Sequence, residues 1–230
     1  MTGALRVALC PHPPLLLREL SGAADAVPEL RTACRSAVSD LTAVRPAEVV
    51  VVGPADHPGP VDAGLTVDVR RFGTTGPRTV PGTALPQSLG VGRRLLEDAG
   101  WRGPTSMHAV GWDAGADELT ALADDLLARP GAALLLLGDG SARRGEKAPG
   151  FLDERAFGFD DAVADALASG EPAALRDLDV TLAADLMVGG RSVLRLLGLL
   201  GDRLRPPRAE LLHRADPYGV SYLDARWELG

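Results

Sequence analysis

The sequence predicts an α/β fold in a single domain, with a central, mostly parallel or mixed sheet and helices on both of its faces. Short apolar runs alternate along the chain with longer stretches whose apolar residues recur at helical spacing. Two of the short runs, Glu48–Gly53 and Ala132–Leu137, are apolar at successive positions, as strands covered on both faces are. No linker-like stretch divides the 230 residues, so we expect one domain over residues 1–230.

Each expected strand is a short run that ends at turn-forming residues. Ala4–Cys10 stops at the prolines of CPHPP. We expect it to lie beside the two apolar runs in one buried sheet, because all three are apolar on both faces. The further expected strands are Leu65–Phe72, whose residues alternate, Ser106–Val110 and Gly219–Trp227.

The expected helices are stretches in which apolar residues recur at i, i+3, i+4 and i+7. Ala24–Val44 shows this spacing, and Cys34 lies on its apolar face, where we interpret it as a small core side chain. Asp113 and Asp179 are expected to cap helices. The later expected helices are Leu89–Ala99, one between Asp113 and Pro130, one through Phe159, Val163 and Leu167, a short one from Pro172, Thr181–Val188 and Val193–Leu200.

The composition restricts the partners of the chain. Its net charge is −7 and its pI is about 5.1, which argues against nucleic acid and anionic membranes. Aromatic residues make up 4%, too few for a base-stacking surface. No apolar run approaches the ~20 residues of a membrane span, and two cysteines do not make a disulfide framework. We therefore expect a cytoplasmic protein that binds a small molecule, with a homo-oligomer possible.

The candidate site lies where three expected strands end. In α/β folds, ligands bind outside the carboxyl ends of the strands. CPHPP, GPADHPG and GDGSARR follow the three most apolar strands, and they supply His12, Asp56, His57, Asp139, Ser141 and Arg143. We expect His12, Asp139, Ser141 and Arg143 to line one pocket. Arg143, Arg144 or Lys147 could bind an anion there, such as the carboxylate of an aromatic acid.

His12 is the most distinctive of these residues. Pro11 and Pro13 fix their own φ angles, and Pro13 also keeps His12 out of the helical region. The direction of the imidazole is therefore set before any ligand arrives, as a metal ligand or a catalytic base requires. The alternative is a core histidine bonded to backbone. We interpret His108 as a strand residue and His213 as a surface residue.

Five segments, taken in order, resemble the class III extradiol ring-cleavage dioxygenases of the subunit-B type and their Memo-like relatives. They are ALCPHPPLLL, VVVVGPADH, LLLLGDGSARRGEKAPGFLDERAFGFDDAVADAL, LAADLMVGGRSVLRLLG and DPYGVSYLDARW. The resemblance covers nearly the whole chain and implies an α/β domain with its site at one sheet edge. It also implies non-heme Fe(II) held by two histidines and a carboxylate, with a further histidine as acid and base.

The resemblance assigns a role to each matching position. His12 matches the first histidine ligand, whereas the second ligand aligns with Ala55 and the acid–base histidine with Ala142. The carboxylate ligand aligns with Met187, which we interpret as a core side chain. His57 lies two residues beyond Ala55, about 7 Å along an extended chain, and would replace the lost ligand only if its loop turned back.

Three functions stay open at this point. The first is a divergent member that binds a small aromatic or anionic metabolite, with little or no dioxygenase activity and no cofactor. The second is an active Fe(II) enzyme with rearranged ligands, namely His12, His57 and either Asp56 or Asp139. The third is a non-catalytic partner subunit. We expect protein made without added iron to carry far less than one equivalent of metal.

Overall fold

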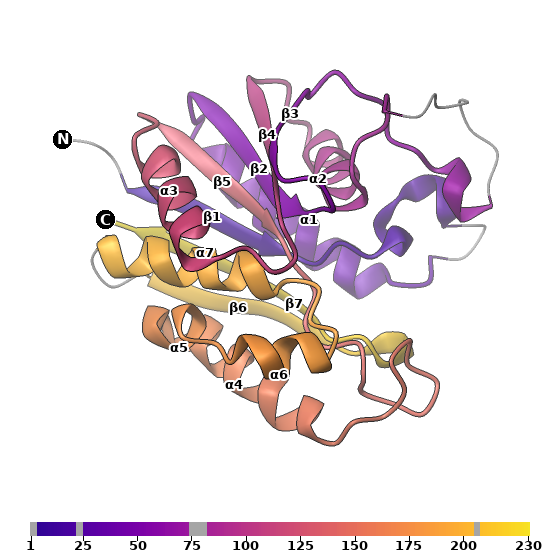
Figure 1. The fold of residues 1–230 in the computed structure, drawn as a ribbon. Helices are drawn as coiled ribbons and strands as arrows, with labels where there is room; N and C mark the ends of the chain where they lie inside the picture. Colours follow the sequence, from indigo (N-terminus) through magenta and orange to yellow (C-terminus); the bar gives the residue numbers. More distant parts are fainter. Residues whose placement is uncertain (1–3, 22–24, 74–81, 205–207) are drawn as a thin grey trace.

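A mixed sheet runs through the computed structural model, which describes residues 4–21, 25–73, 82–204 and 208–230. Its strands are β1 (Leu5–Cys10), β2 (Glu48–Pro54), β3 (Gly59–Val61), β4 (Thr105–Val110), β5 (Ala132–Leu137), β6 (Arg208–Ala215) and β7 (Tyr222–Leu229). They lie side by side in the order β3-β4-β2-β5-β1-β7-β6. The strands β4, β2, β5 and β1 are parallel, whereas β3 and β7 run antiparallel to their neighbours β4 and β1. The chain therefore has the single α/β domain that the sequence predicts (Figure 1).

The three most apolar runs form the centre of this sheet. Leu134 of β5 pairs with Val7 of β1 on one side and with Val50 of β2 on the other. All six residues of β5 are buried. The expectation that these three strands lie side by side is confirmed. The physical reason is that only a strand covered on both faces can bury apolar side chains at every position.

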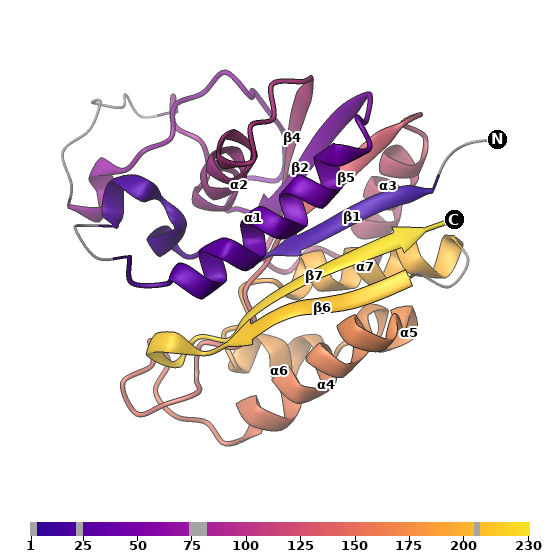
Figure 2. The ribbon, with the colours of Figure 1, turned by 180° about the vertical axis from the view of Figure 1, so that it is seen from behind.

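Helices cover both faces of the sheet. The α-helices are α1 (Pro28–Ala43), α2 (Gln87–Asp98), α3 (Ala116–Leu127), α4 (Arg155–Ser169), α5 (Pro172–Arg176), α6 (Val180–Asp185) and α7 (Arg191–Arg203). The short 3₁₀ helices are η1 (Pro14–Leu16), η2 (Arg18–Leu20), η3 (Arg70–Phe72) and η4 (Pro217–Gly219). Figure 2 shows α1 and α2 on the near face, with α3 and α7 behind the sheet. Two buried apolar clusters result, one on each face.

Local sequence signals account for several helix ends. Asp179 caps α6, accepting hydrogen bonds from the backbone N–H groups of Thr181 and Leu182 at 3.0 and 2.9 Å. Pro172 occupies the first turn of α5, where its missing N–H is no loss. Gly170 ends α4 in the left-handed conformation. The expected helix over Thr181–Val188 is shorter than predicted, because α6 ends at Asp185.

One strand prediction needs correction. Leu65–Phe72 is not a strand: it forms a single bridge, Thr66 with Ala84, and ends in η3. Its alternation arises because Val67 and Val69 are buried in the cluster beneath α1 and α2 while their neighbours face outward. The short strand β3 takes the edge position against β4 instead.

The sequence pattern does not predict β6. This edge strand contains His213, for which the sequence predicts only a surface position. Its pairing with β7 is irregular between Leu211 and His213, so the apolar alternation is interrupted. Asp113 is not a cap either, since α3 begins after Gly115, and the Asp113 carboxylate pairs with Arg191 at 2.7 Å instead.

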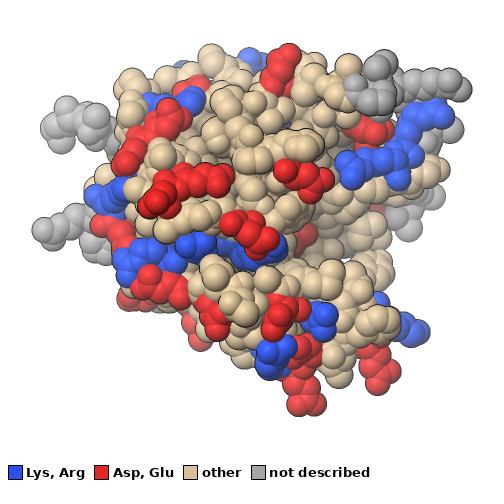
Figure 3. All heavy atoms as spheres, in the orientation of Figure 1, with Lys and Arg blue, Asp and Glu red and all other residues tan. Residues whose placement is uncertain are grey.

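Among the helices of the described residues, none has the length and apolarity to cross a membrane. Acidic and basic side chains are interspersed over the face shown in Figure 3. That view therefore presents no uniformly basic surface of the kind that nucleic-acid-binding proteins use.

Candidate functional site

The sheet brings all three polar segments to its carboxyl edge, two of them from adjacent strands. The strands β1 and β5 are adjacent and parallel, so CPHPP and GDGSARR both leave from their carboxyl ends. The hydrogen bond from Gly138 N–H to the Cys10 carbonyl, at 3.0 Å, continues the pairing to the point of departure. GPADHPG leaves β2 on the other side of β5, where Ala55 N–H still bonds the Val110 carbonyl. The polar segments therefore leave the sheet at the carboxyl ends of its strands, as the sequence predicts.

His12 and Asp139 lie together at this edge. His12 is 5% exposed, and its backbone N–H donates to Asp139 Oδ1 at 2.7 Å. The same oxygen lies 3.5 Å from His12 Nδ1, which is buried and has no hydrogen-bond partner among the described residues. Burial raises the pKa of Asp139, while the nearby imidazole opposes that rise. The pair is a carboxylate that fixes a histidine at the end of a strand.

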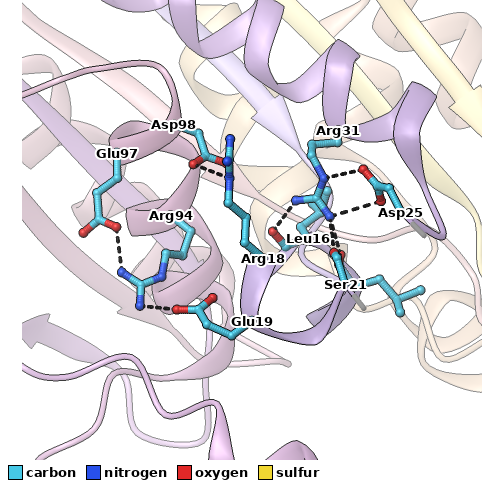
Figure 4. A network of polar contacts seen from close by, with 10 residues as sticks. Leu16, Arg18, Glu19, Ser21, Asp25, Arg31, Arg94, Glu97 and Asp98 are labelled. Atoms are coloured by element: carbon cyan, nitrogen blue, oxygen red, sulfur yellow. Dashed lines mark hydrogen bonds and ion pairs between the residues drawn. The ribbon is translucent and has the colours of Figure 1, made fainter. Parts of the chain in front are cut away.

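The segment after His12 is held by a set of arginine contacts, shown in Figure 4. The Arg31 guanidinium donates to the carbonyls of Leu15 and Leu16 at 2.8 and 2.7 Å, and to Ser21 Oγ at 2.7 Å. It also pairs with Asp25 at 2.8 Å, which lowers the pKa of that carboxyl group. One side chain on α1 therefore fixes the backbone of η1 and the turn beyond it.

Two ion pairs tie the same segment to α2 (Figure 4). Arg18 pairs with Asp98 at 2.8 Å, and Glu19 with Arg94 at 2.5 Å. Gln87 adds a bond from its amide nitrogen to the His12 carbonyl at 3.2 Å. His12 is thus held from both sides, by Asp139 through its N–H group and by α2 through its C=O group.

Ser141 has a different role from the pocket-lining one that we expected. It is fully buried, and its hydroxyl and its backbone N–H donate to the two carboxylate oxygens of Asp160, at 2.5 and 3.0 Å. Arg144 contacts the same carboxylate at 3.3 Å and bonds Asp216 at 2.8 Å. Ser141 therefore anchors the loop after β5 to α4. Asp160 follows Phe159 in the helix after the loop, and nothing in the sequence pattern indicates that it bonds Ser141.

Arg143 lies in the same loop, with its guanidinium partly free. Its Nε is buried and has no hydrogen-bond partner in the described part of the chain. A Cβ on Gly150 would come within 2.7 Å of both Arg143 Cγ and Met187 Sδ, so both side chains lie against this glycine. The neighbouring Ala142 N–H donates to the Leu186 carbonyl at 3.1 Å. The loop after β5 and the segment after α6 therefore pack together around Arg143.

Three exposed apolar side chains stand on left-handed backbone at this end of the molecule. Phe151, Met187 and Tyr218 have φ angles of 58°, 55° and 63°. Their side chains are 73%, 45% and 63% exposed. We call these three residues the apolar rim. Arg45 also has a positive φ, of 54°, but it directly follows the end of α1, where that conformation is common.

Contacts between the loops connect the members of the apolar rim. Gly150 touches Met187 and precedes Phe151 in the chain. Gly219, next to Tyr218, packs so closely on Ala148 that an added Cβ would lie 2.5 Å from the Cβ of that alanine. In Figures 1 and 2 alike, η4 lies beside the loop that follows β5. The loops that carry the rim therefore pack together, with Arg143 and Met187 both against Gly150, and His12 lies beside Gly189 of the segment that follows Met187.

The residues at the family's ligand positions do not fit Fe(II). Ala55 is 7% exposed and Ala142 lies in the packed loop, and neither methyl group can ligate a metal or move a proton. The interpretation of Met187 as a core side chain is wrong, because α6 ends before it and the chain turns it outward. A thioether is also a weak ligand for Fe(II). Of the positions that the resemblance assigns to the metal, only His12 carries a side chain of the expected type.

The rearranged ligand set is not assembled either. His57 and Asp56 are exposed, and the Asp56 carboxylate accepts a hydrogen bond from Trp112 Nε1 at 2.9 Å. Within the described residues, one group of at least three histidine, cysteine or carboxylate side chains has all its ligand atoms within 4.8 Å of one another. It consists of Cys10, Cys34 and Asp224, and contains none of the predicted ligands.

Hollows of about 390 to 560 Å³ occur at four places on the described part of the chain, and their linings do not include His12, Asp139, Ser141 or Arg143. The one of about 540 Å³ adjoins the site, since it is lined by Trp112, Asp185 and Arg191. The remaining candidate, His108, lies in a strand as the sequence predicts. It is half-buried on β4, where burial lowers its pKa.

Comparison with known proteins supports the fold. No family model matches the chain, and no curated protein does. Among solved structures, the chain is similar to an uncharacterized protein, JW3007, from Escherichia coli K12, with a TM-score of 0.54 and 17% sequence identity. The match covers 98% of this chain and 100% of that one. At this identity the likeness extends to the α/β fold alone.

Proposed function

We propose that the chain binds a small aromatic carboxylate at the carboxyl edge of its sheet, without the iron-dependent ring cleavage of the family that it resembles. The Arg143 guanidinium supplies positive charge for the carboxylate. The apolar rim supplies contact for the ring. His12, oriented by Asp139, supplies a polar group on the same edge.

The apolar rim is the observation that carries the proposal. Each non-glycine residue in the left-handed region costs on the order of 1 kcal/mol. Such conformations persist where the surrounding structure imposes them, and they gather at ligand-binding sites. Here each one also places a large apolar side chain in solvent, which is a second cost. Both costs are offset if the side chains of Phe151, Met187 and Tyr218 contact a ligand.

The charge at the site favours an anion. Arg143 Nε is buried and has no hydrogen-bond partner among the residues that the structure describes, which is unfavourable for a cationic side chain unless an acceptor completes it. Other arginines of the same region are paired, Arg144 with Asp160 and Asp216, and Arg155 with Asp153. Arg143 is therefore the arginine of this region that is best able to bind the carboxylate of a ligand.

Binding of benzoate and 3,4-dihydroxybenzoate, measured by isothermal titration calorimetry, tests the proposal. Catechol, which lacks the carboxylate, and cyclohexanecarboxylate, which lacks the aromatic ring, are expected to bind more weakly. Arg143→Gln should weaken binding by about 10- to 100-fold, the effect of removing a charged hydrogen bond worth about 1.5–3 kcal/mol. The matched control is Arg155→Gln, because Arg155 follows the same loop but is paired and exposed.

Two results would contradict the proposal. One is the absence of saturable binding by either aromatic carboxylate, or binding that Arg143→Gln leaves unchanged. The other is catechol-dependent oxygen uptake in the presence of Fe(II) that His12→Ala abolishes. The second result would favour the enzyme with rearranged ligands.

A further inference from the structure

Three side chains that the proposed function does not use meet inside the protein. Cys10 is the last residue of β1, Asp224 lies on β7, and Cys34 lies on the buried face of α1. Leu9 pairs with Ala225 in the antiparallel β1–β7 ladder, which puts Cys10 beside Asp224. In Figure 2, α1 lies on the near face of the sheet and runs alongside β1, the neighbour of β7. All three residues are 0% exposed.

The carboxylate of Asp224 is the unusual member of this group. Neither of its oxygens has a hydrogen-bond partner among the described residues, and both cysteines are free thiols. Burying a carboxylate in this way is costly unless a proton or a cation neutralises it. Burial raises the pKa of Asp224 to about 7, and it raises the pKa of Cys34 to about 11. If this buried position served only for apolar packing, an apolar side chain would be expected there in place of the Asp224 carboxyl group.

We propose that Cys10, Cys34 and Asp224 form a buried site for a thiophilic divalent cation, for which Zn²⁺ is the best match. Their ligand atoms all lie within 4.8 Å of one another. Zn–S bonds of about 2.3 Å and Zn–O bonds of about 2.0 Å put tetrahedral ligand atoms some 3.5–3.8 Å apart, which small rotamer changes reach. Thiolate ligands select zinc over magnesium or calcium.

Charge supports the same choice of ion. Two thiolates and a carboxylate carry three negative charges, which a buried site tolerates only beside a strongly bound cation. Binding would displace the protons of the two thiols and of Asp224, so affinity should rise with pH. This site is separate from the strand-edge site, because it contains neither His12 nor Arg143.

Burial determines how the site must be tested. With no exposed ligand, the folded protein offers no direct entry, so the ion is expected to bind as the chain folds. The full chain is therefore unfolded in denaturant with a thiol reductant and refolded with either Co²⁺ or Zn²⁺. Metal per chain is measured by elemental mass spectrometry after gel filtration. Thiolate-to-cobalt charge transfer is measured by near-ultraviolet absorption.

The wild type should retain about one equivalent of metal and show the charge-transfer band. Cys34→Ala and Asp224→Asn should each weaken retention by at least about tenfold. His12→Asn should leave retention unchanged. No charge-transfer band in the refolded wild type would overturn the proposal, and so would a Cys10–Cys34 disulfide that takes up no metal after reduction. Retention lost in His12→Asn but kept in the two site variants would place the ion elsewhere. If the variants do not fold, the wild-type cobalt spectrum still decides.

Discussion

The Ser141 hydroxyl donates to Asp160 Oδ2 at 2.5 Å, and both side chains are removed from solvent. The sequence placed Ser141 correctly, after β5 at the edge of the sheet. It did not reveal the partner, because Asp160 lies 19 residues further along, in the middle of α4. Residue type and strand-end position predict where a side chain lies, but which group it contacts depends on tertiary packing.

Ser141→Ala should destabilise the protein by about 1–3 kcal/mol, because the buried Asp160 carboxylate loses one of its donors. Asp160→Ala should cost more, about 3–5 kcal/mol, since Arg144 and the Ser141 N–H then lose their buried acceptor. Urea unfolding followed by circular dichroism measures both. Ser36→Ala, at an exposed position on α1, is the control and should stay within about 0.5 kcal/mol. Equal, small effects at Ser141 and Asp160 would contradict the anchoring role.

Within single elements, the sequence signals worked best where one residue fixes the backbone. Asp179 and Pro172 start their helices as expected, because capping and a fixed φ are local effects. Leu65–Phe72 and β6 were missed for the opposite reason. Alternation indicates which side chains are buried, but whether a run pairs as a strand depends on a neighbour distant in sequence. For Cys34 the sequence predicts one feature and not the other. Its burial on α1 is predicted, whereas its proximity to Cys10 and Asp224 depends on how β7 packs.

On β4, His108 predicts a pH dependence of stability. Burial lowers its pKa below the ordinary value of 6.5, so the native state binds fewer protons than the unfolded state as pH falls through that value. The contribution of neutral His108 to the free energy of unfolding is fully present above about pH 6.5, and it is lost progressively as the pH falls below that value. His108→Gln should therefore flatten the fall in stability between about pH 7 and pH 5. Urea midpoints across that range measure the slope, and an identical slope in the variant would contradict the assignment.

Across the whole molecule, the central strand separates two apolar clusters. Leu134 and Leu136 belong to the cluster beneath α3 and α7, and Leu135 and Leu137 to the one beneath α1 and α2. The layered fold was predictable because strands of this kind require helices on both faces. The loops of the site were less predictable. The exposure of Met187 and the left-handed turns at Phe151 and Tyr218 follow from packing between segments that the sequence pattern does not connect.

Substitutions on the two sides of β5 test this layering. Leu134→Ala and Leu135→Ala should each cost about 2–5 kcal/mol, because each removes a fully buried side chain from a different cluster. Leu211→Ala, at a half-buried position on the edge strand β6, should cost less. Denaturant unfolding monitored by tryptophan fluorescence gives the three values. A small effect at either β5 position would show that one face is loosely packed.

The neighbours of β1 have a consequence for the order of events during synthesis. This strand pairs with β5 and with β7, and Leu5 pairs with Leu229, so its partners lie about half the chain and nearly the whole chain away. Because β1 precedes both of its partners in the chain, it has no neighbour to pair with until β5 has been synthesised, and its second edge stays open until β7 is complete. Long-range pairing of this kind slows folding and leaves apolar edges exposed while the chain is nascent. Chaperone contact with the nascent chain would thus be expected at the unpaired edges of β1.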